Sequence, residues 1–255
     1  MENVTLTKES RDFIDNLRIY LFSSGKKTKE IDEITQELEL HLYEAEKRNQ
    51  GVEHIIGSSP KEYMEQLSNE MSFDVKGWSK YVPIIILGAF AGIVLKDIFF
   101  DSFEYSMLQL VGYPLVCILL LLAYMFSFKS IASRKLSKTK EFSLLYLVSF
   151  LSIALFAGLL FADNYVKTPI FTLGSTGNMM VAALAIAFLV GISIWSKTLI
   201  SIVLPVFYIL PEYLVGLTSL SEATKITTSS LLMFGGIGLY LLVSSKNMKK
   251  DPSVH

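Results

Sequence analysis

Hydrophobic and polar positions are distributed differently along the two parts of the chain. Up to about residue 80, apolar residues recur every three or four positions among charged ones, which is the pattern of amphipathic helices. From about residue 81 to 245, apolar residues follow one another in long blocks. A block of about 20 apolar residues can cross the roughly 30 Å hydrocarbon core of a bilayer. The pattern therefore predicts a water-soluble helical domain over residues 1–75, followed by a membrane domain over residues 76–245.

Three helices are predicted in the water-soluble domain. The first runs from about Lys8 to Ser23 and has Thr7 as its cap. The second begins at Thr28, which we take as its cap, and a glycine ends it. The third begins at Ser59, where a serine, a proline and a glutamate form a capping box. The stripe of the second helix consists of Ile31, Ile34, Leu38, Leu42 and Ala45, and we expect the bundle to be held together by Tyr20, Leu38, Leu42, Tyr63 and Leu67.

Six apolar blocks are predicted to be membrane helices. Trp78 and Tyr81 precede the first block as an aromatic belt, with Lys76 and Lys80 beside them. The fold class is therefore all-α: a small three-helix domain, a six-helix transmembrane bundle and a tail over residues 246–255. The blocks cover residues 81–100, 107–128, 142–162, 178–195, 198–217 and 226–244.

Basic residues predict the orientation of these helices. Lysine and arginine gather in the links after the second and fourth blocks and in the C-terminal tail, and short basic links stay in the cytoplasm. We expect a multi-pass protein of the cell membrane with both termini in the cytoplasm. The segment 129–140 is either an orientation signal alone or also docks the helical domain or anionic lipid headgroups. The basic residues are Lys129, Arg134, Lys135, Lys138, Lys140, Lys197, Lys246, Lys249 and Lys250.

Charge is unevenly divided between the two domains. The whole chain has a formal net charge of −1, but the first 80 residues are acidic and the remainder is basic. An acidic domain repels phosphate, so we expect no direct binding of nucleic acid. A basic protein is the better partner, and the exposed acidic face with Glu33, Glu37 and Glu44 is the surface we expect it to contact.

The sequence offers little chemistry for an enzyme. No H-E-x-x-H, Walker lysine, G-x-S-x-G or Cys/His cluster occurs, and Cys117 is the single cysteine. Glu37, His41 and Glu44 share one helix face and could present ligands to a metal, although a solvated histidine is the simpler interpretation. We expect no enzymatic activity, no catalytic or metal-binding residues and no cofactor.

The role that we expect of an ionisable residue in a membrane helix depends on its depth in the bilayer. Lys96 and Asp97 are adjacent near the end of the first block and are interpreted as reaching back to the interface. The alternative is a contact site for an ion or peptide, formed together with Asp101 and Glu104. Glu212 follows a proline near the end of the fifth block and is also interpreted as interfacial.

Small residues and prolines predict how the membrane helices pack. Gly88 and Gly92 form a G-x-x-x-G motif, which favours close packing of helices within the chain or, as a sharper alternative, a homodimer. Pro205 and Pro211 mark the fifth helix as a candidate for a kink, either a packing kink or a mobile gate. Asn178 begins the fourth block and is interpreted as a helix cap.

Residues 8–73 resemble a bacterial family. The resemblance rests on FIDNLRIYL (13–21), EIDEITQELELHLYEA (30–45) and IIGSSPKEYMEQLSNEM (55–71), which contains a G-S-x-P-K-E-Y signature. Proteins of this family carry a HAAS-type helical signalling domain in front of several membrane helices. The resemblance implies a link to PadR-type winged-helix transcription regulators, to which the domain would relay a membrane event. The membrane part varies in such proteins, so its function does not carry over.

Two functions follow as hypotheses. In the first, the chain is a membrane signalling or regulatory protein whose helical domain binds a protein partner, for which a winged-helix transcription regulator is the candidate. In the second, it is a transporter, channel or immunity-type protein with the helical domain as an assembly module. The six blocks show no clear internal repeat, which disfavours a typical secondary transporter. The expected partners are the lipid bilayer, the regulator and, in the homodimer alternative, a second copy of the chain.

Overall fold

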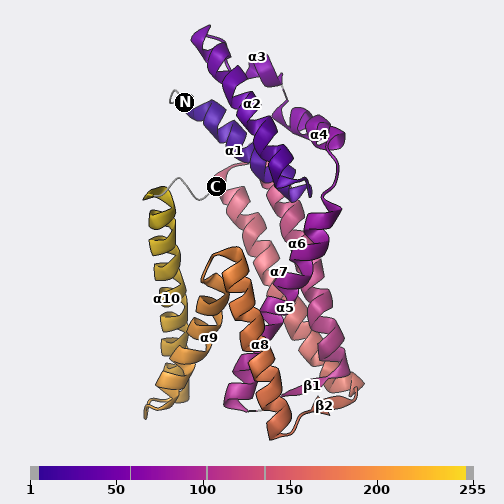
Figure 1. Ribbon diagram of the computed structural model, residues 1–255, viewed down its shortest axis with the longest axis vertical. Helices are drawn as coiled ribbons and strands as arrows, with labels where there is room; N and C mark the ends of the chain where they lie inside the picture. The colour runs from indigo at the N-terminus through magenta and orange to yellow at the C-terminus, as the bar shows by residue number, and fades with distance from the viewer. Residues whose placement is uncertain (1–5, 58, 102, 135, 251–255) are drawn as a thin grey trace. The chain divides into compact units, whose positions relative to one another are not determined.

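The computed structural model describes residues 6–250 except residues 58, 102 and 135, with backbone only for residues 247–250 (Figure 1). Helix accounts for 83% of the structure, which confirms the all-helical class. The described residues divide into two compact units. The first unit contains residues up to 83 together with 108–167, and the second contains residues 84–107 and those from 168 onward. The helical domain therefore clusters with two of the membrane helices.

The helical domain consists of α1 (Lys8–Ser23), α2 (Thr28–Lys47), the one-turn α3 (Glu53–Ile56) and α4 (Pro60–Glu70). The bounds predicted for the first helix are confirmed, and the Thr7 hydroxyl accepts a hydrogen bond from the Ser10 amide at 3.3 Å. The Ser59 hydroxyl likewise accepts from the Glu62 amide at 3.3 Å. The predicted cap Thr28 is wrong by one residue, since Thr28 is already helical and Lys27 precedes it without a side-chain cap.

Apolar side chains from all four helices form one core. Leu17, Leu21 and Leu42 are fully buried, and Met64 is 1% exposed. Ile34, predicted in the buried stripe, is only half-buried, and its neighbour Thr35 is buried instead. Of the residues expected to hold the bundle together, Tyr20, Leu38 and Leu42 are buried in this core, and Tyr63 and Leu67 pack against it from partly buried positions.

A carboxylate of α2 completes the N-terminus of α1. Glu46 accepts hydrogen bonds from the Thr7 amide at 3.0 Å, the Thr7 hydroxyl at 2.5 Å and the Ser10 hydroxyl at 2.5 Å. Burial acts to raise the pKa of Glu46, but the hydrogen bonds from Ser10 and Thr7 outweigh it, so the pKa lies below its ordinary value of 4.5. The negative charge also faces the positive end of the helix dipole.

Five helices of the described chain are long and apolar enough to cross a membrane. They are α5 (Val75–Phe100), α6 (Met107–Ser133), α7 (Lys138–Val166), α8 (Ser175–Ser196) and α10 (Glu222–Lys250). The block predicted over 198–217 forms α9 (Ile200–Gly216), which has only 17 residues. Lys197 takes a left-handed conformation (φ 54°) that ends α8, so a turn occupies the start of that block. The predicted count of six membrane-crossing helices is thus not confirmed.

Two short strands, which the sequence pattern did not predict, join two of the links. In β1 (Glu104–Ser106) and β2 (Ile170–Thr172), Tyr105 pairs with Phe171 in an antiparallel register. The amide of Met107 extends the pairing by donating to the carbonyl of Pro169 at 2.9 Å. The pairing therefore joins the link that follows α5 to the link that follows α7.

Candidate functional site

An ion pair joins α5 to α9 near the C-terminal end of α5. The Nζ atom of Lys96 lies 2.8 Å from Oε2 of Glu212 and 4.5 Å from the centroid of the Tyr208 ring. Tyr208 and Glu212 are one turn apart on α9, so their side chains reach the same lysine. The Lys96 side chain is 23% exposed and that of Glu212 is 46% exposed. The ammonium is thus held between a carboxylate and the negative face of an aromatic ring.

The seam between α5 and α9 continues on both sides of this pair. The rings of Phe99 and Tyr213 meet edge to face, with centroids 5.3 Å apart. One turn earlier on α5, a Cβ placed on Gly92 would lie 3.5 Å from Cγ of Pro205, and one on Gly88 would lie 3.6 Å from Cδ1 of Ile192 in α8. Both glycines of the predicted motif therefore face helices of the same chain. Homodimerisation through them stays a prediction.

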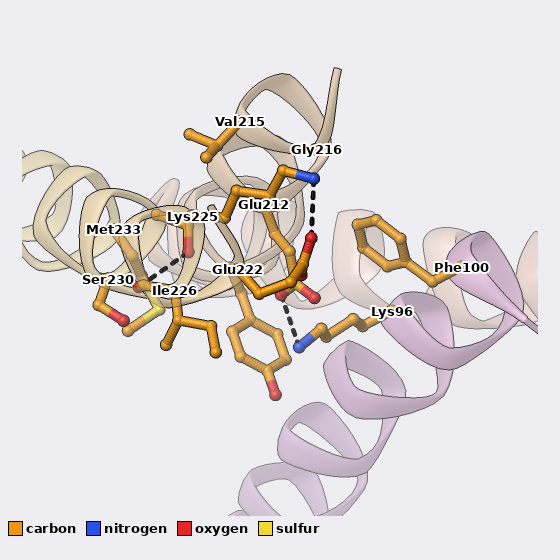
Figure 2. A pocket seen from close by; sticks show the side chains of 12 residues that line it. Lys96, Phe100, Glu212, Val215, Gly216, Glu222, Lys225, Ile226, Ser230 and Met233 are labelled. Atoms are coloured by element: carbon orange, nitrogen blue, oxygen red, sulfur yellow. Dashed lines mark hydrogen bonds and ion pairs between the residues drawn. The ribbon is translucent and has the colours of Figure 1, made fainter. Parts of the chain in front are cut away.

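A cavity of about 500 Å³ opens beside the ion pair, between α5, α9 and α10. A second pair lies in its wall, since Nζ of Lys225 is 2.9 Å from Oε1 of Glu222. Figure 2 shows the Lys96 ammonium and the Glu212 carboxylate meeting in this cavity, with Glu222 and Lys225 beside them. The cavity thus contains two ammonium groups and two carboxylates. The remaining wall combines apolar side chains with hydroxyl-bearing ones: Phe100, Val215, Ile226 and Met233, and Tyr208, Ser229 and Ser230.

The residues adjacent to Lys96 in the sequence have other roles. Asp97 accepts a hydrogen bond from the hydroxyl of Tyr105, whose side chain is 3% exposed, so it ties the end of α5 to β1. Glu104 lies in β1 opposite Thr172. The sequence analysis predicted that Lys96 and Glu212 lie at the membrane interface, but it did not predict that they pair. The available signal was that the two residues have opposite charges and lie at the ends of two apolar blocks on the same predicted side of the membrane.

The other predicted membrane residues lie as follows. Pro205 and Pro211 are both inside α9, which is a single helix, so a mobile gate there stays a prediction. The prediction that Asn178 caps a helix is wrong. Helix α8 begins at Ser175 after Gly174, and the Asn178 amide already donates to the Gly174 carbonyl at 2.9 Å within the first turn.

The predicted partner-binding glutamates are exposed on α2. Each pairs with a basic residue four positions away in the sequence: Glu33 with Lys29 at 3.6 Å, Glu37 with His41 at 3.7 Å and Glu44 with Arg48, the C-cap of α2, at 4.0 Å. Exposed pairs of this kind contribute little to stability, so these side chains remain available to a partner. Among the described residues no group of three or more His, Cys, Asp or Glu side chains is arranged to hold a metal ion. Lys135 of the basic segment lies outside the described residues.

Comparison with models of known protein families finds a match in the membrane part of the chain. Residues 90–207 match the family model described as the HAAS transmembrane region. This range runs from α5 to the middle of α9 and ends before Glu212. No curated protein and no solved structure matches the chain significantly. The match lies in the membrane part, whose sequence we expected to vary among such proteins. It does not cover residues 8–73, the helical domain from which the resemblance was drawn. Residues 90–207, slightly less than half of the chain, are therefore similar to the HAAS transmembrane region, which confirms the resemblance to HAAS-type proteins, and the apolar helices indicate a multi-pass membrane protein.

Proposed function

We propose that this protein is a membrane signalling protein, in which a cytoplasmic domain formed mainly by three helices relays the packing of a six-helix membrane bundle to a protein partner. In this proposal α9 serves as the sixth membrane helix and both termini face the cytoplasm. The HAAS-type transmembrane region supports the link between such a domain and membrane helices. The resemblance of residues 8–73 suggests a PadR-type winged-helix transcription regulator as the partner.

The observation that carries the proposal is the fixed joint between the helical domain and the start of α5. The amide of Asp74 donates to the carbonyl of Gly25 at 2.8 Å, and Nζ of Lys26 donates to the carbonyl of Met71 at 2.8 Å. Gly25 has φ 75°, and the ring of Phe73 occupies the space where a Cβ would lie. The turn between α1 and α2 is therefore bound to the segment that leads into the membrane.

Aromatic packing strengthens this joint. The ring of Trp78, in the first turn of α5, lies 6.3 Å from that of Phe22 and 6.5 Å from that of Phe73, measured between centroids. The Asp74 carboxylate accepts from the Gly77 amide at 2.9 Å and so caps the start of α5. A rotation or shift of α5 would therefore act on the end of α1, because no flexible linker separates them.

A second membrane helix also contacts the domain. Ala132, in the last turn of α6, is 5% exposed and belongs to the same apolar core as Leu17 and Leu42. Nζ of Lys129 lies 4.9 Å from the centroid of the Tyr20 ring. Burial, with Glu65 adding a smaller effect, raises the pKa of Tyr20, so the ring stays neutral and keeps its hydroxyl proton. The basic segment therefore contacts the helical domain through apolar and cation–π packing, in addition to any effect on orientation.

The acidic face of α2 is the surface that we assign to the partner. Glu33, Glu37 and Glu44 are 63%, 75% and 65% exposed, and they lie outside the core of the domain. A negative patch of this kind attracts a basic protein surface and raises the rate of association. Phosphate backbones would be repelled by it, so the regulator and not the membrane protein would contact DNA.

Co-purification from the native host tests the proposal. The full chain should recover a PadR-type regulator, and reversal of the three glutamates to lysine should lower that recovery by about tenfold. The matched control reverses Asp12 and Asp15, two exposed acidic residues of α1, and should leave recovery unchanged. Absence of any regulator with the wild-type chain, or full recovery with the reversed chain, would contradict the proposal.

A further inference from the structure

The cavity between α5, α9 and α10 is electrically balanced. Lys96 is paired with Glu212 and Lys225 with Glu222, so two positive and two negative charges share one space of about 500 Å³. A ligand with a single charge would displace one partner of a pair and leave that partner uncompensated away from water, which is costly. A zwitterion avoids this cost, since its anion can take the place of a glutamate and its cation that of a lysine.

The position along α5 sets the depth of the cavity. Trp78 marks the interface at the start of α5, and Lys96 follows it by about 27 Å of helix, just short of the roughly 30 Å thickness of the hydrocarbon core. The long side chain of Lys96 covers the remaining distance, so its ammonium lies at the opposite interface, at the level of lipid headgroups. The cavity is therefore located where phospholipids present a phosphate.

The walls of the cavity suit an amphiphile. Ile226 and Met233 of α10 and Phe100 of α5 line it together with the charged groups. Further along α10, Leu231 and Phe234 are 69% and 68% exposed and so offer an apolar surface to an acyl chain. An apolar surface that continues from a polar cavity matches a lipid better than a soluble zwitterion.

From this arrangement we infer that the cavity binds the headgroup of a zwitterionic phospholipid whose cation is a primary ammonium. Lys96 and Lys225 bind its phosphate, while Glu212 and Glu222 accept hydrogen bonds from its ammonium. A quaternary ammonium has no N–H to donate and binds these carboxylates less well. The bound lipid would be the signal that the membrane part senses. That signalling role rests on the proposed function, whereas lipid binding can be measured without a protein partner.

Lipid binding by the purified full chain tests the inference. Native mass spectrometry in detergent measures the affinity for phosphatidylethanolamine, phosphatidylcholine and phosphatidylglycerol with identical acyl chains. We expect the affinity for phosphatidylethanolamine to exceed the other two by about tenfold, the effect of one charge-assisted hydrogen bond. Free phosphoethanolamine, added at the same concentration, should not displace the lipid.

Variants of the cavity sharpen this test. Glu212→Gln should lower the affinity for phosphatidylethanolamine about tenfold and favour phosphatidylglycerol, because the cavity becomes positive. The double variant Lys96→Gln/Glu212→Gln leaves no unpaired charge, so it serves as the test if the single variant folds poorly. It should lose the preference for phosphatidylethanolamine over the other two lipids. Lys140→Gln removes an exposed lysine outside the cavity and serves as the control.

Three outcomes would overturn the inference. They are equal affinity of the wild-type chain for the three lipids, an unchanged preference in the double variant, and displacement of the lipid by free phosphoethanolamine. The last would identify a soluble zwitterion as the ligand. None of these three outcomes depends on a transcription regulator. The experiment therefore distinguishes a failure of lipid binding from a failure of the proposed relay to a protein partner.

Discussion

The helical domain and the membrane part contain the same types of apolar residue, but these residues are mostly buried in the first region and mostly exposed in the second. In the helical domain Leu17, Leu21 and Leu42 are fully buried, because burial from water is what holds so small a domain together. In α10 no residue of the apolar stretch is buried, and Leu231 is 69% exposed. Lipid is as apolar as leucine, so these side chains gain little from contact with one another. The comparison shows that apolar content alone does not reveal where a core lies.

Different contacts therefore hold the two regions together. In the membrane part helices approach closely at small residues: the space for a Cβ on Gly112 of α6 is taken by Leu159 of α7, and that on Gly236 of α10 by the ring of Phe207. A few polar links, such as Lys96 with Glu212, fix the register of neighbouring helices. The helical domain instead combines a continuous core with the carboxylate of Glu46 at the start of α1.

Truncating one leucine in each region should give the largest contrast. Leu42→Ala removes a fully buried side chain and should destabilise the helical domain by about 2–5 kcal/mol, which is enough to unfold it. Leu231→Ala on the exposed face of α10 should change stability by less than about 0.5 kcal/mol. Hydrogen exchange of the full chain in nanodiscs measures both. Equal effects of the two substitutions would contradict the comparison.

Adding a methyl group to α10 should separate packed from open glycines. Gly236→Ala forces the ring of Phe207 to move and should destabilise the pair of helices α9 and α10 by about 1–3 kcal/mol. Gly235→Ala meets nothing within 4 Å and gains the same helix propensity, so it should be neutral or stabilising. Thermal unfolding in detergent compares the two variants, and indistinguishable Tm values would argue against close packing at Gly236.

The smallest of these effects should come from Glu46 and should depend on pH. Its folded pKa lies below the ordinary value of 4.5, so the ionised carboxylate contributes stability above that pH and loses it as the pH falls through the folded pKa. Glu46→Gln should therefore cost about 1 kcal/mol at neutral pH and have less effect in acid. Urea unfolding of the helical domain, followed at pH 7 and pH 3, checks both statements. A cost that is the same at both pH values would exclude the charge as its cause.

Local patterns made much of the helical domain predictable. The spacing of Phe13, Leu17 and Leu21, with a cap at Thr7, was sufficient to place α1, because helical periodicity and capping act within a few residues. The resemblance to HAAS-type proteins likewise came from such local patterns. The role of Glu46 was missed because its partners Thr7 and Ser10 lie on another helix.

The candidate site depended on contacts that a local pattern does not encode. Lys96 and Glu212 are far apart in the sequence, and hydropathy placed both at an interface without showing that they meet. The strands β1 and β2 have three residues each, too few to give an alternating pattern. Asn178 was assigned to the start of a helix that begins at Ser175, since polar residues at the head of a membrane helix resemble a link.

The passage of α5 from the helical domain into lipid is the central claim, and an accessibility scan tests it most directly. Single cysteines for spin labels would be placed along α5 in a Cys117→Ala background, with the full chain in nanodiscs. We predict that labels at Lys76 and Ser79 are reached by a water-soluble relaxation agent, and that labels at Ile85 and Ala89 are reached by oxygen instead. Access of the water-soluble agent to Ile85 and Ala89, or access of oxygen alone to Lys76 and Ser79, would contradict the account.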